Sequence, residues 1–351
     1  MNVFAKFSAV ALAATALTST SFANGRHPGS ALVYPVQYSG LDSSGASGQF
    51  FFTIACVTNS NLTPQTPFSF GGSTNVQYDY VNTVADPLKP LKPLHCFVND
   101  VVEFLSPADT FCVLTNCHNA STEAGYLVVH AQDPSKFKTD WSWDYLMGSE
   151  MVVTAVGGMY AINAIPFSSP LPDGAETDLD GDGQLDFDGA EYQGIADTLY
   201  IDSFLAVSNS SLTLINMTGG VDFTATVKFD IWNDNEFPFS TTVQFRCWFN
   251  QPLEVVSQVF SESYLEQNTP NDPSELDINC DGFSEFETGW AKINGVVASS
   301  TAETIPNPAL LGAITSGPEF IFDGGRLLWE SENKQLNGDF IKFGVDDPEF
   351  P

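Results

Sequence analysis

The sequence predicts an all-β protein made of two tandem β-sandwiches, and three observations lead to this fold class. The apolar runs are short and rich in β-branched and aromatic residues, including 29 Phe. Gly, Pro, Asn, Asp and Ser separate these runs, and no long segment carries the 3.6-residue period of a helix. A chain of 351 residues, 43% of them hydrophobic, is long enough to bury two such cores.

Seven segments carry the strand pattern, at 31–38, 49–57, 75–81, 126–131, 151–156, 221–232 and 242–249. Several alternate apolar and polar residues, which is typical of strands with one buried face. This alternation places the carboxylates of Asp79 and Asp230 on the solvent side of their strands. Short antiparallel strands of this kind predict immunoglobulin-like (Ig-like) sandwiches.

The two halves of the chain share a spaced pattern. Residues 76–82 (VQYDYVN) match residues 227–233 (VKFDIWN), and twenty residues after each leading Val stands a Cys followed by an aromatic residue. Further matches, in chain order, are 57–59 with 207–209, Gly125 with Gly289, and Gly148 with Gly312. The pattern predicts duplication of one sandwich.

The first residues have the pattern of a secretory signal. Lys6 is followed by an apolar run and by Ser21-Phe22-Ala23, which supplies small residues before a cleavage point near Ala23. The predicted organisation is a signal peptide at 1–23, a first sandwich at 24–168, an acidic linker loop at 169–192, and a second sandwich at 193–351 with another acidic loop at 277–288. The mature chain is expected outside the cytoplasm, secreted, at the cell surface or in a periplasm.

Both acidic loops have the spacing of a calcium loop, with oxygen side chains at positions one, three, five and nine and Gly at six. The expected ligands of the first are Asp178, Asp180, Asp182, Gln184, Asp186 and Asp188. Those of the second are Asp277, Asn279, Asp281, Phe283, Glu285 and Glu287, with the residue at position seven contributing its backbone carbonyl in each loop. The expected cofactor is therefore Ca²⁺, in a structural role.

Position twelve departs from the EF-hand pattern. It holds Gly189 in the first loop and Thr288 in the second, where an EF-hand has a bidentate Glu. Asp188 and Glu287, one residue earlier, are candidate substitutes, and Glu191 stands just beyond the first loop. The loops resemble those of dockerins and thrombospondin type 3 repeats. The resemblance covers about a dozen residues at each site, and dockerin function is not carried over because the two loops are far apart.

Six cysteines in an exported chain predict disulfides. The alignment of the halves makes Cys117 equivalent to Cys280, so Cys247 is expected to pair with Cys280 and, by analogy, Cys96 with Cys117. Cys56 and Cys112 then form the remaining pair.

Composition excludes some functions. With 43 acids against 12 bases, the formal charge of −31 repels nucleic acid and anionic lipid, and no apolar run predicts membrane insertion. Nucleophile elbows, zinc-protease motifs and phosphate-binding loops are absent from the sequence, so no catalytic residue is assigned and the chain is not predicted to be an enzyme.

Trp141 and Trp143 fall on one face of an extended segment, which makes them a candidate ligand platform, although core packing is the commoner role of such residues. The stretch 245–249 (FRCWF), and Cys117-His118-Asn119 before Gly125-Tyr126, resemble uncharacterised secreted β-sandwich proteins of environmental bacteria. That resemblance implies no particular activity.

The sequence thus favours an exported, calcium-stabilised protein with a structural or adhesive role at the cell surface or in the extracellular matrix. One alternative is a carbohydrate-binding module or polysaccharide-active enzyme. Another is a surface protein that self-assembles in response to calcium. The expected partners are surface glycan, matrix or further copies of the chain.

Overall fold

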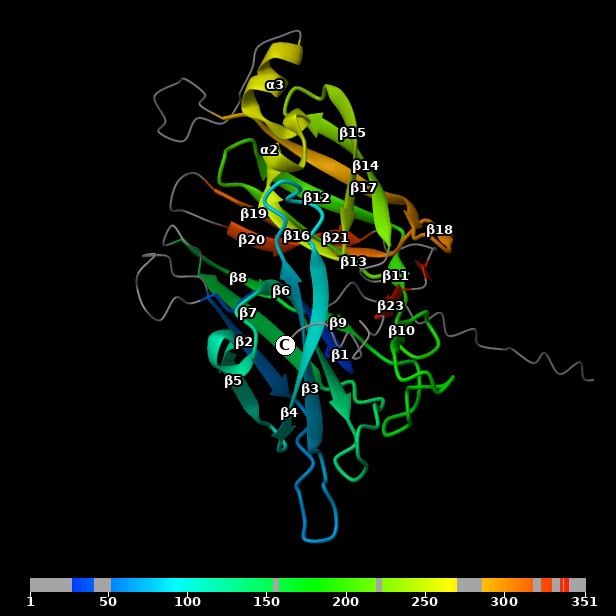
Figure 1. The fold of residues 1–351 in the computed structure, drawn as a ribbon. Coiled ribbons are helices and arrows are strands. Elements are labelled where there is room, and N and C mark those ends of the chain that lie inside the picture. Colours follow the sequence, from blue (N-terminus) through cyan, green and yellow to red (C-terminus); the bar gives the residue numbers. More distant parts are fainter. Residues whose placement is uncertain are drawn as a thin grey trace, which may run out of the picture.

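The structure, a computed structural model, describes residues 27–40, 52–153, 158–218, 223–269, 286–317, 323–329, 335–336 and 338–340. Antiparallel strands form two pairs of sheets, so the fold is all-β as predicted (Figure 1). None of the described helices is long and apolar enough to cross a membrane. These helices are α1 (Thr115–His118), α2 (Leu253–Val256), η2 (Gln258–Phe260) and α3 (Glu262–Asn268).

The first sandwich packs a sheet of order β4-β3-β6-β1-β9 against a sheet of order β5-β2-β7-β8. Its core takes residues from both sheets, among them Tyr34, Val57 and Leu127. The strands are β1 (Ala31–Tyr38), β2 (Phe52–Asn59), β3 (Thr74–Val84), β4 (His95–Leu105), β5 (Thr110–Leu114), β6 (Ala124–Gln132), β7 (Leu146–Val153), β8 (Met159–Asn163) and β9 (Ile165–Phe167).

The second sandwich packs a sheet of order β15-β14-β17-β12-β21, with β18 beside β17, against a sheet of order β16-β13-β19-β20. The core between them includes Leu214, Phe229 and Ile293. The strands are β12 (Thr198–Leu205), β13 (Ser211–Asn216), β14 (Thr224–Asn233), β15 (Pro238–Arg246), β16 (Trp248–Pro252), β17 (Thr288–Ser299), β18 (Thr304–Pro306), β19 (Leu310–Ser316), β20 (Asp323–Arg326) and β21 (Leu328–Trp329).

Strand for strand, the two sandwiches have the same order, with β3 corresponding to β14, β6 to β17 and β7 to β19. The matched Gly residues hold equivalent registers, because Gly125 lies opposite Asn82 and Gly289 lies opposite Asn233. The match of 57–59 with 207–209 is wrong. Val57 pairs with Gly148 as Leu214 pairs with Gly312, so the structural equivalent of 57–59 is 214–216. The two sandwiches therefore share one strand order, and duplication of one sandwich stays a prediction.

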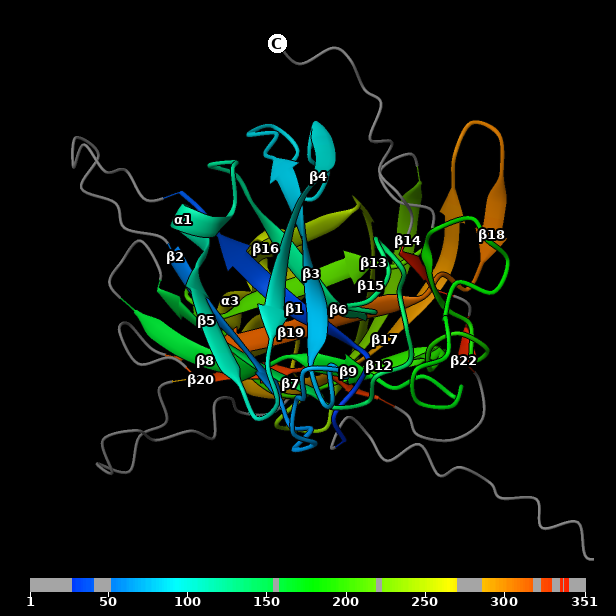
Figure 2. The same ribbon diagram turned by 90° about the horizontal axis from the view of Figure 1, so that it is seen from below.

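The two sandwiches stack on each other through a third apolar cluster. Successive residues of β1 alternate between the core of the first sandwich and this interface, so the strand is buried on both faces. Ile215 and Leu311 enter the interface from the second sandwich. Across it, Trp248 Nε1 donates a hydrogen bond of 2.8 Å to the backbone oxygen of Pro35. Figure 2 looks along this stack, with the first sandwich nearer to the viewer.

The segment that joins the sandwiches is packed into the interface. Leu185, Phe187 and Tyr192 are buried there. Strand β10 (Leu185–Phe187) pairs with β23 (Gly338–Phe340), and β11 (Ile195–Ala196) pairs with β22 (Gln335–Leu336). Backbone from near the C-terminus therefore forms two short two-stranded sheets with this connecting segment.

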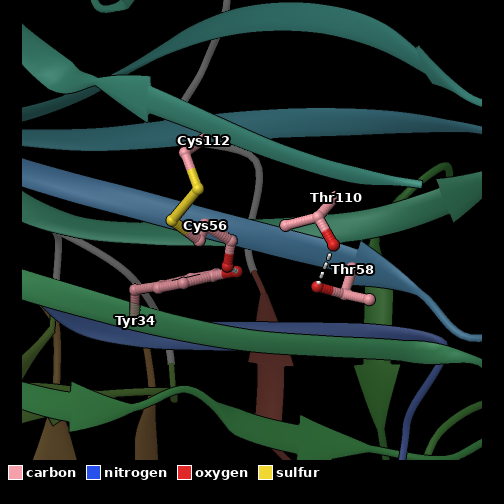
Figure 3. Close-up of a disulfide and its surroundings, with 5 residues drawn as sticks. All are labelled: Tyr34, Cys56, Thr58, Thr110 and Cys112. Carbon is pink, nitrogen blue, oxygen red and sulfur yellow. Dashed lines mark hydrogen bonds between the residues drawn. A yellow bond between two sulfur atoms is a disulfide. The ribbon is translucent and has the colours of Figure 1, made fainter. Parts of the chain in front are cut away.

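One disulfide lies within the first sandwich. Cys56 on β2 and Cys112 on β5 are directly opposite each other and bonded, which is the pair expected from the sequence (Figure 3). On one side of it Tyr34 donates a hydrogen bond to the backbone oxygen of Cys56, and beyond it the hydroxyls of Thr58 and Thr110 lie 2.9 Å apart.

The second disulfide links the two sandwiches, because Cys96 at the start of β4 is bonded to Cys247 after β15. The predicted pairs Cys96–Cys117 and Cys247–Cys280 are therefore wrong. The prediction assumed that each repeat closes its own disulfide, whereas equivalent strand ends of the two repeats meet in the interface core, where both cysteines are buried. Cys117 is exposed and unbonded, and Cys280 lies outside the described residues.

Candidate metal centre and the adjoining pocket

The first acidic loop wraps around the carboxylate of Asp178. This carboxylate accepts hydrogen bonds from the backbone N–H groups of Gly181, at 2.8 Å, and Gly183, at 3.1 Å. The two glycines have φ values of 81° and 70°, in the left-handed region that a side chain disfavours. The Gly at position six therefore makes the tight turn that the sequence pattern predicts.

Glu191 closes the loop from outside the predicted ligand set. It is 3% exposed, and its two carboxylate oxygens accept hydrogen bonds from the backbone N–H groups of Leu179 and Asp186. Burial raises the pKa of Glu191 above its ordinary value. The charges of Asp178 and Asp180 raise it further, and the two N–H donors offset part of the effect.

Ligand atoms of Asp178, Asp180 and Glu191 lie within 4.8 Å of one another, so this triad can hold a metal ion. Two of the predicted ligands belong to it, and Glu191 takes the place that Asp188 was expected to fill. Asp188 instead caps a turn, because its Oδ1 accepts hydrogen bonds from the N–H groups of Ala190 and Glu191. The residues between Asp186, at position nine, and Glu191 form this turn, and the turn brings Glu191 back to the loop.

The other predicted ligands of the first loop flank the triad. The carboxylate of Asp182 accepts hydrogen bonds from the backbone N–H of Gln184, at 2.7 Å, and from its side-chain amide. Asp186 lies on β10, paired with Asp339. Of the second loop, Asp277, Asn279, Asp281, Phe283 and Glu285 lie outside the described residues, whereas Glu287 is described and buried.

The Trp pair does not form a binding platform. The rings of Trp141 and Trp143 do share a face, and they stack on each other with centroids 4.7 Å apart. Trp143 is only 6% exposed and packs in the core of the first sandwich, with its Nε1 directed at Asn59 Oδ1 at 3.4 Å. Trp141 donates its Nε1 hydrogen to Thr74. The stacking covers one face of each ring, and Trp143 is buried, so the two rings do not present a shared exposed surface to a sugar.

Next to the metal loop, the outer face of β3 and β6 forms the floor of a polar pocket of about 340 Å³. The loop supplies one wall, and the segment after β6 supplies another. The polar lining residues are Gln77, Asp79, Asp100, His130, Gln132, Lys138, Thr139, Asp140, Glu176, Asp178 and Gln184.

Buried His130 lies between two carboxylates in this pocket. Its Nε2 is 2.9 Å from Asp79 Oδ2 and its Nδ1 is 3.0 Å from Asp140 Oδ1. Burial alone would lower the pKa of His130, but the charges of Asp140 and Asp79 outweigh this effect and raise the pKa to about 10. The imidazole is therefore a cation at neutral pH, held by two ion pairs.

The position of Asp79 corrects the alternation argument. Asp79 was expected on a solvent face, yet it is 3% exposed. The chain after β6 folds back over this face through bridges of Gln132 with Asp140 and of Trp141 with Glu176. Asp230, its counterpart in the second sandwich, stays partly exposed and pairs with Lys228 at 2.8 Å.

No protein-family model matches the chain, and a search of curated proteins found no match.

Proposed function

We propose that this protein is an exported, calcium-stabilised β-sandwich protein with a structural or adhesive role at the cell surface or in the extracellular matrix. The observation that carries the proposal is the triad of Asp178, Asp180 and Glu191 in the segment between the two sandwiches. A cation bound there would fix the segment whose apolar residues fill the interface. Calcium would thus set how the two sandwiches are joined.

The donor set favours Ca²⁺ over other metals. All three donors are carboxylates, which suit hard cations, and the triad has neither His nor Cys for zinc. Flexible acidic loops with six to eight oxygen ligands are typical of Ca²⁺, whereas Mg²⁺ needs a stricter octahedron. Calcium sites of extracellular modules bind in the range of about 10⁻⁴–10⁻³ M. The disulfides are in keeping with an oxidising compartment.

Thermal unfolding in EDTA and across a Ca²⁺ titration tests the proposal. Saturation at about one hundred times the dissociation constant should stabilise the folded protein by roughly 2.7 kcal/mol. The variant Glu191→Gln should lose most of this gain because it removes the buried ligand. The control Asp202→Asn removes the same charge from an exposed position on β12, where the carboxylate accepts a hydrogen bond from the backbone N–H of Ser203. Equal calcium gains in both variants would refute the proposal.

The structural or adhesive role needs its own measurement. Light scattering and sedimentation with and without Ca²⁺ would separate a stabilised monomer from calcium-driven self-assembly. Binding to matrix and surface glycans under the same conditions tests adhesion. A monomer that binds neither cells, matrix nor itself at millimolar Ca²⁺ would contradict this role.

A second candidate function, recognition of a polar saccharide, is favoured by the pocket beside the metal loop. Its carboxylates can accept hydrogen bonds from hydroxyl groups, and its side-chain amides can both accept and donate them. The calcium loop forms one wall of the pocket. Glycan-array binding that is lost in Asp100→Asn and Glu176→Gln, both on the exposed side of the pocket, would support it. A blank array with the calcium-loaded protein would count against it.

A further inference from the structure

Helix α3 lies at the end of the second sandwich farthest from the first (Figure 1), and a second group of acidic side chains gathers near it. Here the turn after β14, the start of β17 and the end of α3 come together. Thr288 donates its N–H and hydroxyl hydrogens to Asp234 Oδ2, at 3.4 and 3.3 Å. The side-chain amide of Asn233 donates to Thr269 Oγ1 at 2.8 Å. The three elements are thus held together by hydrogen bonds around Asp234.

Glu287 is buried at this junction. Its exposed fraction is 0%, and its carboxylate oxygens have no well-oriented hydrogen bond among the described residues, although the side chains of Asp234 and Asn233 lie within hydrogen-bonding reach. Asn235, in the same turn as Asp234, also has a buried Oδ1 without a partner. A buried polar group that lacks a partner costs about 1–3 kcal/mol, and more when it is charged. The described residues therefore satisfy this carboxylate poorly, and a bound cation would satisfy it together with Asp234.

The electrostatic surroundings of Glu287 are acidic. Burial raises its pKa most, and the carboxylates of Asp234 and Glu266 add to this, so the pKa reaches about 7. None of the groups that shift this pKa is a cation, and only the nearby Asn233 side chain acts in the opposite direction. The missing partner should therefore carry positive charge and accept oxygen ligands.

We propose that Glu287 and Asp234 are ligands of a second site for a hard divalent cation, Ca²⁺, in the second sandwich. The available donors are oxygens, as this class of ion requires. Glu287 enters the site from the position just before β17, Asp234 enters from the β14–β15 turn, and Glu266 adds negative charge from α3. Residues 277–285 lie outside the described residues and carry none of this argument.

The competing arrangement is a metal-free pair in which protonated Glu287 shares its hydrogen with Asp234. The two arrangements differ in what Glu287→Gln does. An amide can replace a protonated acid without loss, but it is a poor replacement for a calcium-binding carboxylate. Counting the ions bound per chain therefore separates them.

The experiment measures bound calcium by atomic emission after equilibrium dialysis at about 1 mM Ca²⁺. Glu287→Gln should bind one ion fewer than the wild type, and Asp234→Asn should weaken the same site by about tenfold or more. The matched control is Glu150→Gln, which changes another fully buried glutamate without an acidic cluster and should leave the count unchanged. An unchanged count in both Glu287→Gln and Asp234→Asn would overturn the proposal.

Terbium luminescence gives a readout that does not depend on the count. Trp232 and Trp290 stack with ring centroids 4.1 Å apart, and they flank the site in sequence, next to Asn233 and three residues after Glu287. Tb³⁺ bound here should emit when tryptophan is excited, and Glu287→Gln or Asp234→Asn should reduce that emission. If Glu287→Gln does not fold, Asp234→Asn alone decides, because its amide oxygen can still accept from Thr288.

This proposal extends calcium stabilisation to the second sandwich, and its failure can be told apart from failure of the first site. In a Glu191→Gln background the first site is disabled, so any remaining ion that depends on Glu287 belongs to the second. Loss of calcium in Glu191→Gln with no change in Glu287→Gln would leave the proposed function standing and remove only this site.

Discussion

At the scale of single residues, His130 should make stability depend on pH. Its pKa is about 10 in the folded protein and near 6.5 in an unfolded chain, so its stabilising contribution is complete below about pH 6.5. That contribution declines as the pH rises from about 6.5 to about 10. Urea unfolding should therefore show falling stability over this window.

The variant His130→Gln should lose about 3–5 kcal/mol near neutral pH, because Asp79 and Asp140 would be buried without their cation. It should also lose the part of the pH dependence between about 6.5 and 10. The charged groups around the imidazole are Asp79 and Asp100 on β3 and β4, and Asp140 and Lys138 after β6. A variant with the slope of the wild type would show that the pH dependence does not come from His130.

Replacement of Glu150 should stabilise the folded protein, whereas replacement of His130 should destabilise it. It is fully buried on β7, and burial raises its pKa well above the ordinary 4.5, offset only in part by the Val36 N–H. An acid whose pKa is raised on folding loses stability as the pH rises above its unfolded value. Glu150→Gln should therefore raise the melting temperature near pH 8 and change it little near pH 4. Equal effects at both pH values would contradict this account.

The local sequence pattern was sufficient to assign Asp178, Asp180 and the glycine at position six to the candidate metal loop, because residues that are neighbours in the chain specify a calcium loop. His130, Asp79 and Glu191 could not be assigned in this way. Their surroundings depend on a segment that folds back over β3 and β6 and on a turn that inserts residues before the closing acid. Glu191 had the only usable signal, an acid just beyond a loop whose twelfth position is Gly189.

At the scale of elements, the disulfide that joins β4 to the residue after β15 can be tested by mapping which cysteines are bonded. Peptide mapping without reduction should recover Cys96 linked to Cys247, with Cys117 as a free thiol. The double variant Cys96→Ser/Cys247→Ser should lose about 2–5 kcal/mol of stability. Cys117→Ser, on exposed α1, should change stability little. Recovery of a Cys96–Cys117 peptide would refute this connectivity.

Strand positions were largely accessible from sequence. The predicted segments at 31–38, 75–81 and 126–131 overlap β1, β3 and β6, because alternation and β-branched residues are local signals. The disulfide pairing between the two sandwiches could not be predicted from the sequence. Which strand ends meet depends on the stacking of the sandwiches, and the predicted pairs Cys96–Cys117 and Cys247–Cys280 failed for this reason.

At the scale of the whole molecule, the net charge of −31 should make stability depend on salt. Raising NaCl from about 10 mM to about 0.5 M shortens the screening length and weakens the repulsion among the acids, so the melting temperature should rise. Millimolar Ca²⁺ should add a further increase at constant ionic strength. That increase should disappear in Glu191→Gln/Glu287→Gln. A melting temperature that is flat or falls with salt would contradict the role given to charge.

The all-β class was predicted from composition and pattern, but the stacked arrangement was not. Segment 169–192 was expected to be a linker loop, and the structure packs its later part, β10, against the C-terminal strand β23. The interface core forms from single residues of many strands, such as Val33, Ile215 and Leu311, whose common location is not visible in any one stretch of sequence.

The Cys96–Cys247 bond also determines how the molecule would carry a mechanical load. Tension that enters the chain before residue 96 and leaves it after residue 247 passes through the two sulfur atoms and bypasses everything between them. The bypassed stretch contains Asp178, Asp180 and Glu191. In a protein pulled from its two ends, the covalent path of the tension would therefore skip these carboxylates, and force would reach them through contacts between strands such as the pairing of β10 with β23.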